Sequence, residues 1–156
     1  MTIMEDCLRM TSPRLKPFLA VMLAFFWCVS APALCEEKTT IIYSYSANDL
    51  TLSRAEILQI FTGNRQYWPD GSKITIYRLN SDSPLHQQFS REHLRMFPYQ
   101  LDRLWNQMTY SGQGEPPRTV KNEMELIKAV MNTSGAIGYA TESGMTEYSK
   151  RKAEPQ

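Results

Sequence analysis

The sequence predicts an α/β fold, in which a small and mostly parallel sheet is flanked by helices. Short β-branched and aromatic segments alternate along the chain with segments whose apolar residues recur at helical spacing. The expected order is strand, helix, strand, three helices and a final strand. Alternation of this kind favours a layered fold in which helices cross over between neighbouring strands.

Three segments have the composition of strands. Residues 41–45 read Ile-Ile-Tyr-Ser-Tyr, residues 74–77 read Ile-Thr-Ile-Tyr, and residues 136–140 read Ala-Ile-Gly-Tyr-Ala. A turn is expected before the second strand, at residues 67–71, because a proline and a glycine fall together there.

The first helix is predicted by several agreeing signals. Ser53 is placed as its N-cap, and Glu56 three residues later completes a capping box. Leu52 is placed to pack against Ile57 as a hydrophobic staple. Gly63 ends the helix in the usual C-terminal position. Its apolar face is expected to consist of Ile57, Ile60 and Phe61.

Two further helices are expected between residues 83 and 108. Ser83 is placed to cap the first, with Pro84 at its first helical position. The pair at residues 97–98, Phe-Pro, interrupts the pattern. The second helix follows from apolar residues at helical spacing, namely Leu101, Leu104, Trp105 and Met108. Helical spacing of this kind is typical of core residues.

The last third of the chain begins with a loop. Residues 110–119 contain glycines and prolines, and Asn122 and Glu125 then form a second capping-box pattern. The apolar face of the helix that follows is Leu126, Ile127, Val130 and Met131. We interpret Gly135 and Gly138 as permitting tight backbone turns. Residues 143–156 are expected to form a polar, loosely structured C-terminal tail.

Residues 1–33 have the pattern of a secretory signal peptide. Arg14 and Lys16 supply positive charge, and residues 18–29 contain no charged residue. This apolar segment is shorter than the ~20 residues that a membrane-spanning helix needs. Ala-Pro-Ala at residues 31–33 fits an A-x-A cleavage site. We therefore expect a mature domain over residues 34–142 in the periplasm, with no stable membrane insertion after cleavage.

Three alternatives stay open at this end of the chain. They are cleavage after Cys35, retention of the apolar segment as an uncleaved anchor, and lipid attachment to Cys35. Leu34 argues against lipid attachment, because a lipoprotein signal has a small residue at that position. Translation from Met4 or Met10 would change nothing after the cleavage site.

Composition excludes several function classes. Of 17 basic and 16 acidic residues, three and two precede residue 34, so the mature domain is formally neutral. A neutral domain lacks the broad positive field of a nucleic-acid-binding protein, and no nucleic-acid partner is expected. Cys7 and Cys28 lie before the cleavage site and Cys35 lies next to it. An internal disulfide and a cysteine-based metal site are therefore not expected.

The segment at residues 81–86, Ser-Asp-Ser-Pro-Leu-His, connects a predicted strand to a predicted helix. A helix N-terminus presents unpaired backbone N–H groups and the positive end of the helix dipole, which together suit an oxyanion. The strand before it supplies Arg78, whose guanidinium is a forked donor. We therefore expect an anion site that uses side chains or backbone N–H groups of Ser83, Ser81, Arg78, Leu85 and His86.

Simpler interpretations of these residues stay open. Ser83 is a favoured N-cap, Arg78 would serve equally in a pair with a surface carboxylate, and His86 would be ordinary as an exposed first-turn residue. Asp82 also brings a negative charge to the same place. No G-x-S-x-G motif is present, and two histidines without a third ligand make a poor metal site. We expect no enzyme activity, no cofactor and no metal.

Three motifs resemble the phosphate-binding periplasmic proteins of ABC transporters. Residues 52–63 with 68–71 resemble that family's stretch L-s-…-I-F-x-G-…-W-x-D-G. Residues 76–89 resemble its arginine, S-G-T and phenylalanine, and residues 135–139 resemble its G-x-I-G-Y strand. Together they span about residues 41–140. The resemblance implies one lobe of a type II periplasmic binding protein, a phosphate or other small-anion ligand, and a membrane transporter or sensor as partner.

The resemblance places the family's phosphate-holding serine on Ser83 and its arginine on Arg78. The glycine and threonine of S-G-T are Pro84 and Leu85 here, which removes one N–H and one hydroxyl donor. Two functions therefore stay open. One is capture of phosphate or another small oxyanion for transport or sensing. The other is a ligand-free protein-interaction module of the same fold, acting with a membrane sensor, a transporter or a second copy of itself.

Overall fold

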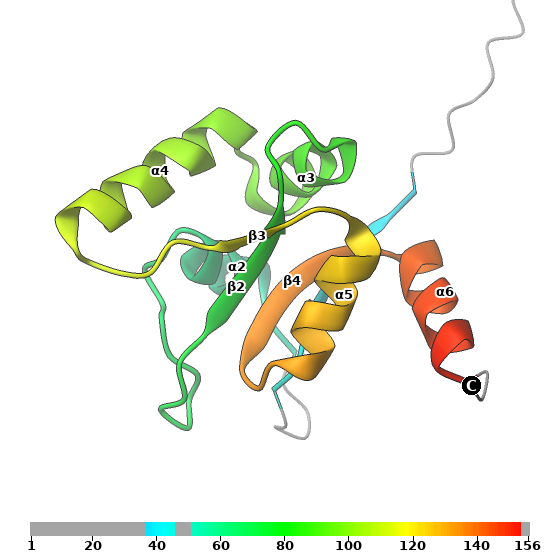
Figure 1. The fold of residues 1–156 in the computed structure, drawn as a ribbon. Helices are drawn as coiled ribbons and strands as arrows, with labels where there is room; N and C mark the ends of the chain where they lie inside the picture. The colour runs from blue at the N-terminus through cyan, green and yellow to red at the C-terminus, as the bar shows by residue number, and fades with distance from the viewer. Residues whose placement is uncertain (1–36, 46–50, 154–156) are drawn as a thin grey trace, which may run out of the picture. The chain divides into compact units, whose positions relative to one another are not determined.

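The computed structural model describes residues 37–45 and 51–153. They contain a four-stranded sheet in the order β1-β4-β2-β3 (Figure 1). β4 pairs antiparallel with β1 and parallel with β2, and β2 pairs parallel with β3. The predicted α/β fold with a small, mostly parallel sheet is confirmed. The strands are β1 (Thr39–Tyr43), β2 (Thr75–Leu79), β3 (Arg118–Val120) and β4 (Ala136–Thr141).

Helices flank this sheet on both faces. They are α2 (Arg54–Phe61), α3 (Pro84–Phe89), the π-helical turn η2 that continues it (Ser90–Leu94), α4 (Pro98–Ser111), α5 (Glu123–Asn132) and α6 (Glu142–Ala153). Within the part of the chain that the structure describes, no helix is long and apolar enough to cross a bilayer. The predicted signal peptide lies outside the described residues.

Strand β4 is buried along its whole length and separates the two helical layers. The Tyr139 ring stacks on Phe89 of α3 with ring centroids 4.0 Å apart. Its neighbour Gly138 faces α5, and a Cβ on it would lie 2.7 Å from Cδ2 of Leu126 and 2.9 Å from Cγ2 of Val130. Since successive strand residues point to opposite faces, α3 and α5 cover opposite sides. Gly138 thus permits close helix packing, and our interpretation of it as a turn residue was wrong.

The predicted helix caps form largely as expected. The Ser53 hydroxyl accepts from the N–H of Glu56 at 3.3 Å, and the Glu56 carboxylate accepts from the Ser53 N–H at 2.9 Å. This reciprocal box begins α2. At α5 only half of the box forms. Asn122 accepts from the N–H of Glu125 at 2.9 Å, but the Glu125 carboxylate accepts from the N–H of Lys121 at 3.0 Å.

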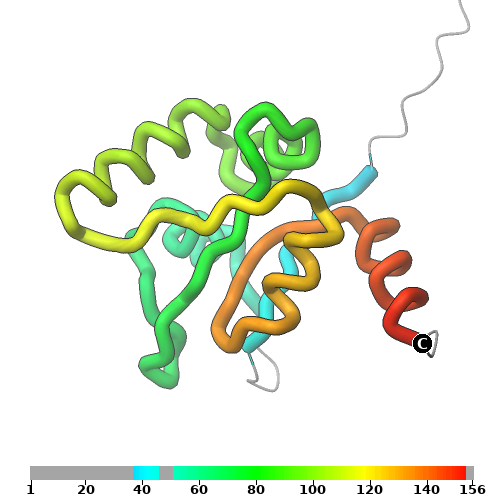
Figure 2. Tube along the Cα trace, in the orientation of Figure 1, coloured from blue at the N-terminus to red at the C-terminus, as the bar shows by residue number. Residues whose placement is uncertain are grey.

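The segment predicted as a loop at residues 110–119 contains more structure than expected. α4 extends to Ser111 and ends at Gly112, whose φ of 68° is left-handed. The segment then runs along the edge of the sheet and pairs with β2 as β3, which the yellow part of the trace in Figure 2 follows. β3 has three residues and little burial, so it carries no alternating apolar pattern that would reveal it in the sequence.

The expectation of a loosely structured tail after Glu142 was wrong, because the segment forms α6. The hydroxyl of Thr141 accepts from the N–H of Gly144 at 3.0 Å and so caps the helix. Basic residues in the last turn complement the helix dipole, and Glu147 pairs with Arg151 at 2.6 Å one turn later. The helix is polar, as predicted, and it is stabilised by its N-cap and by its charged side chains.

Candidate functional site

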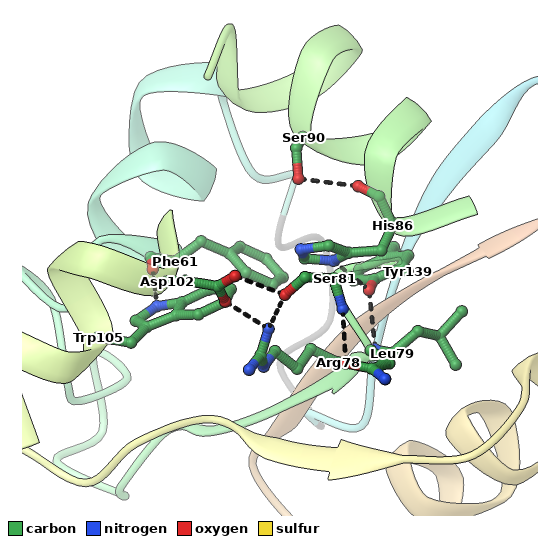
Figure 3. Close-up of polar contacts among 10 residues, drawn as sticks. Phe61, Arg78, Leu79, Ser81, His86, Ser90, Asp102, Trp105 and Tyr139 are labelled. Atoms are coloured by element: carbon green, nitrogen blue, oxygen red, sulfur yellow. Dashed lines mark hydrogen bonds and ion pairs between the residues drawn. The ribbon is translucent and has the colours of Figure 1, made fainter. Parts of the chain in front are cut away.

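The candidate site lies where β2 ends and α4 passes over it. Tyr77 and Leu79 of β2 are buried, and Arg78 between them points to the opposite face of the sheet, toward α4. Figure 3 shows the side chains of Arg78, Ser81 and Asp102 converging at this place. Two of these three, Arg78 and Ser81, belong to the anion site that the sequence predicts.

The three side chains form a closed set of polar contacts. Nη1 of Arg78 donates to Oδ1 of Asp102 at 2.8 Å and to the Ser81 hydroxyl at 3.0 Å. The Ser81 hydroxyl donates in turn to Oδ2 of Asp102 at 2.6 Å. The side chains of Arg78 and Asp102 are 18% and 31% exposed, so the pair is partly shielded from water. Such a pair is stronger than a fully exposed surface pair.

The indole of Trp105 supports the guanidinium of Arg78. The guanidinium carbon lies 4.6 Å from the ring centroid, in the geometry of a cation–π contact. Trp105 is buried, and its Nε1 donates to the carbonyl of Phe61 at 2.8 Å. The stack fixes the plane of the guanidinium against α4. Trp105 is therefore a core residue, as its spacing indicates, and also part of the site.

Arg78 keeps donor capacity beyond this set. A guanidinium has five N–H groups, and only those on Nη1 bond to protein groups among the described residues. Nε is buried and has no partner there. The two N–H groups of Nη2 are the donors left for a ligand.

A cleft of about 430 Å³ opens beside this set. Small-ligand sites in proteins span roughly 300–1,000 Å³. A second cavity, next to Gly63 and Met108, holds about 30 Å³ and has room for little more than water. The lining of the larger cleft comes from the end of β2 and its loop, from α4 and from the segment before β3: Arg78, Asn80, Ser81, Asp82, Asp102, Trp105, Asn106, Pro116 and Pro117.

The lining of this cleft contains one positively charged side chain, Arg78, and two negatively charged ones, Asp82 and Asp102. Among the residues described, no three His, Cys, Asp or Glu side chains gather where they would hold a metal ion. The chemistry available in the cleft is therefore hydrogen bonding and charge pairing, centred on one guanidinium.

The remaining predicted site residues do not line this cleft. Ser83 precedes α3 and its hydroxyl makes no cap bond, so the simple cap interpretation does not describe it. Pro84 has no N–H, which leaves those of Leu85 and His86 at the start of α3. The structure thus divides the predicted residues between the cleft and the adjacent helix start.

The His86 side chain is fully buried, so its interpretation as an exposed first-turn residue was wrong. Its Nδ1 lies 2.6 Å from the Tyr139 hydroxyl, which accepts from the N–H of Leu79 at 2.9 Å. Burial, and then the positive charge of Arg78, lower the pKa of His86 to about 4, against an opposing effect of Asp102. The ring is neutral at pH 7.

Asp102 is a site residue that the sequence analysis does not predict. It lies 24 positions from Arg78, on a helix whose register is set by Leu101 and Trp105. Nothing local distinguishes it from any other helix carboxylate. The only sequence signal is its i, i+3 spacing to Trp105, which places both on one side of α4.

Comparison with known proteins bears on the fold. No protein-family model matches the chain, and no curated protein matches it. A solved structure, that of PstS from Borrelia burgdorferi, is similar with a TM-score of 0.52 and 18% sequence identity. The match covers 74% of this chain and 45% of that one, so the chain spans less than half of that protein. The described fold is thus distantly similar to part of the PstS fold.

Proposed function

We propose that this protein is an exported, non-enzymatic, single-lobe binding module that takes phosphate or another small oxyanion at the Arg78 cleft, for transport or sensing. The observation that carries the proposal is the convergence of Arg78 and Ser81 on a cleft of ligand size. The fold likeness to PstS and the motif resemblance support the same class of ligand.

The donors proposed for the anion are the Arg78 guanidinium and the Ser81 hydroxyl. The start of α3 lies next to them in sequence, and Ser83 with the N–H groups of Leu85 and His86 would extend the donor set. Charge-assisted bonds from a guanidinium to an oxyanion are among the stronger polar contacts in proteins. A single lobe leaves the anion partly hydrated, so the expected affinity is modest.

Isothermal titration of the purified protein with phosphate, sulfate and acetate, at low salt, tests this proposal. Binding of at least one anion at a single site per chain is the expected result. Absence of heat with all three, together with an unchanged melting temperature at millimolar anion, would remove the anion function.

A second candidate is a ligand-free interaction module of the same fold. Asp102 favours it, because an internal carboxylate already pairs with Arg78 and Ser81. Partners consistent with this function are a membrane sensor, a transporter or a second copy of the chain. Crosslinking in intact cells discriminates the two functions. A specific crosslinked partner with no anion response supports the second candidate, and an anion response without a partner supports the first.

A further inference from the structure

We infer that the Asp102 carboxylate is an internal competitor for the anion, and that an incoming anion must displace it from Arg78 and Ser81. This inference rests on the proposed function. It names the residue that limits the affinity of that site.

The geometry of the guanidinium carries the inference. A guanidinium binds an oxyanion most strongly in a bidentate manner, through two N–H groups on neighbouring nitrogens along its Nη1–Nη2 or Nε–Nη2 edge. Nε of Arg78 is buried, so the Nε–Nη2 edge is closed to a ligand. Nη1 donates to Asp102 and Ser81. While Asp102 occupies Nη1, only Nη2 is open to a ligand. Bidentate binding of an anion therefore requires Asp102 to leave the Nη1–Nη2 edge.

Ser81 strengthens the same conclusion. Its hydroxyl has one hydrogen, which it donates to Oδ2 of Asp102 at 2.6 Å. While that bond holds, Ser81 offers an external anion only lone pairs. Departure of Asp102 therefore frees donors on Arg78 and Ser81 together, the two side chains that converge on the cleft.

Charge and exposure make displacement feasible. The lining holds Asp82 and Asp102 against Arg78, so an anion that leaves Asp102 in place meets a net negative surface. The Asp102 side chain is 31% exposed and lies at the cleft surface, where water can solvate it after it leaves. A neutral residue at position 102 would remove both the direct competition and part of the repulsion.

The test compares phosphate affinity in the purified protein and four variants. Asp102→Asn is the main variant, and Asp102→Ser is a second one in case the amide disturbs folding. Asp82→Asn is the matched control, since it removes the same charge from the same lining without touching Arg78. Arg78→Gln in the Asp102→Asn background removes the donor. Each is checked for folding by circular dichroism and thermal unfolding before titration.

If the anion displaces Asp102, the Asp102→Asn or Asp102→Ser variant should bind phosphate at least tenfold more tightly than the unmodified protein. Asp82→Asn should raise the affinity less than threefold. Arg78→Gln in the Asp102→Asn background should abolish the increase. Unchanged or weaker affinity in the folded position-102 variants, while the unmodified protein binds, overturns the inference alone. An equal gain in Asp82→Asn also overturns it, because general repulsion then explains the effect. No binding in any folded protein overturns the proposed function, and the inference with it.

Discussion

The hydroxyl of Tyr139 lies 2.6 Å from Nδ1 of His86 and joins β4 to α3 inside the core. The same hydroxyl accepts from the backbone N–H of Leu79 at 2.9 Å. Leu79 is the last residue of β2 and follows Arg78 directly. One buried phenol therefore holds together the strand end that carries Arg78 and the helix that follows the site loop.

Tyr139→Phe should destabilise the protein by about 2–6 kcal/mol. The change leaves the Leu79 N–H and Nδ1 of His86 buried without a partner, and each unsatisfied group costs about 1–3 kcal/mol. Urea unfolding followed by circular dichroism measures the difference. Tyr148→Phe on α6 is the control, with an expected change below about 0.5 kcal/mol. Equal stability of Tyr139→Phe and the unmodified protein would show that the contact is unimportant.

His86 should make the protein less stable as the pH falls from about 6.5 to 4. Its native pKa of about 4 lies below the ordinary value of 6.5. The unfolded chain therefore binds the proton first, and stability is complete above pH 6.5 and decreases below it. The full loss is roughly 3 kcal/mol. Unfolding curves at several pH values, compared with His86→Gln, isolate this effect from the carboxylates. Parallel pH profiles in the two proteins would contradict it.

Gly138→Ala should destabilise the protein by about 1–3 kcal/mol, because a methyl group there overlaps Leu126 and Val130 on the fully buried face of α5. Gly114→Ala is the control. Its new Cβ meets only the flexible amide of Gln66, at 3.1 Å, and we expect a change below about 0.5 kcal/mol. Thermal unfolding measures both variants. Equal effects at the two positions would argue against close packing of α5 on β4.

The protein purified from an expressing bacterium should begin at Leu34. Ala31 and Ala33 fit the small-residue positions of a cleavage site, so Ala33→Trp should block processing. Intact-mass spectrometry of the envelope fraction measures both results. A mature chain that retains residues 1–33, or one that carries lipid on Cys35, would contradict this prediction.

The features that the sequence predicted well depend on near neighbours. Ser53 and Glu56 are three residues apart, and their capping box formed as expected. The spacing of Leu101 and Trp105 placed both in the core. Local hydrogen bonding and helical periodicity depend on residues close together in the chain, so these elements can be predicted from a single sequence.

The features that the sequence did not predict depend on distant neighbours. Asp102 reaches Arg78 across 24 positions, and His86 became a core residue through Tyr139, 53 positions away. α6 lacked a strong apolar face, and its cap at Thr141 depends on where β4 ends. Such contacts are set by how the strands and helices pack, which no local pattern encodes.

Phosphate titration of Arg78→Gln beside Arg91→Gln tests the central proposal most directly. Both changes remove one positive charge, but Arg91 lies exposed on η2, where its Nε donates to the Gln87 carbonyl at 3.2 Å, outside the cleft. We expect phosphate to bind the unmodified protein and Arg91→Gln alike, and to bind Arg78→Gln at least tenfold more weakly. Equal affinity in all three folded proteins, or no binding in any of them, would contradict an anion site at Arg78.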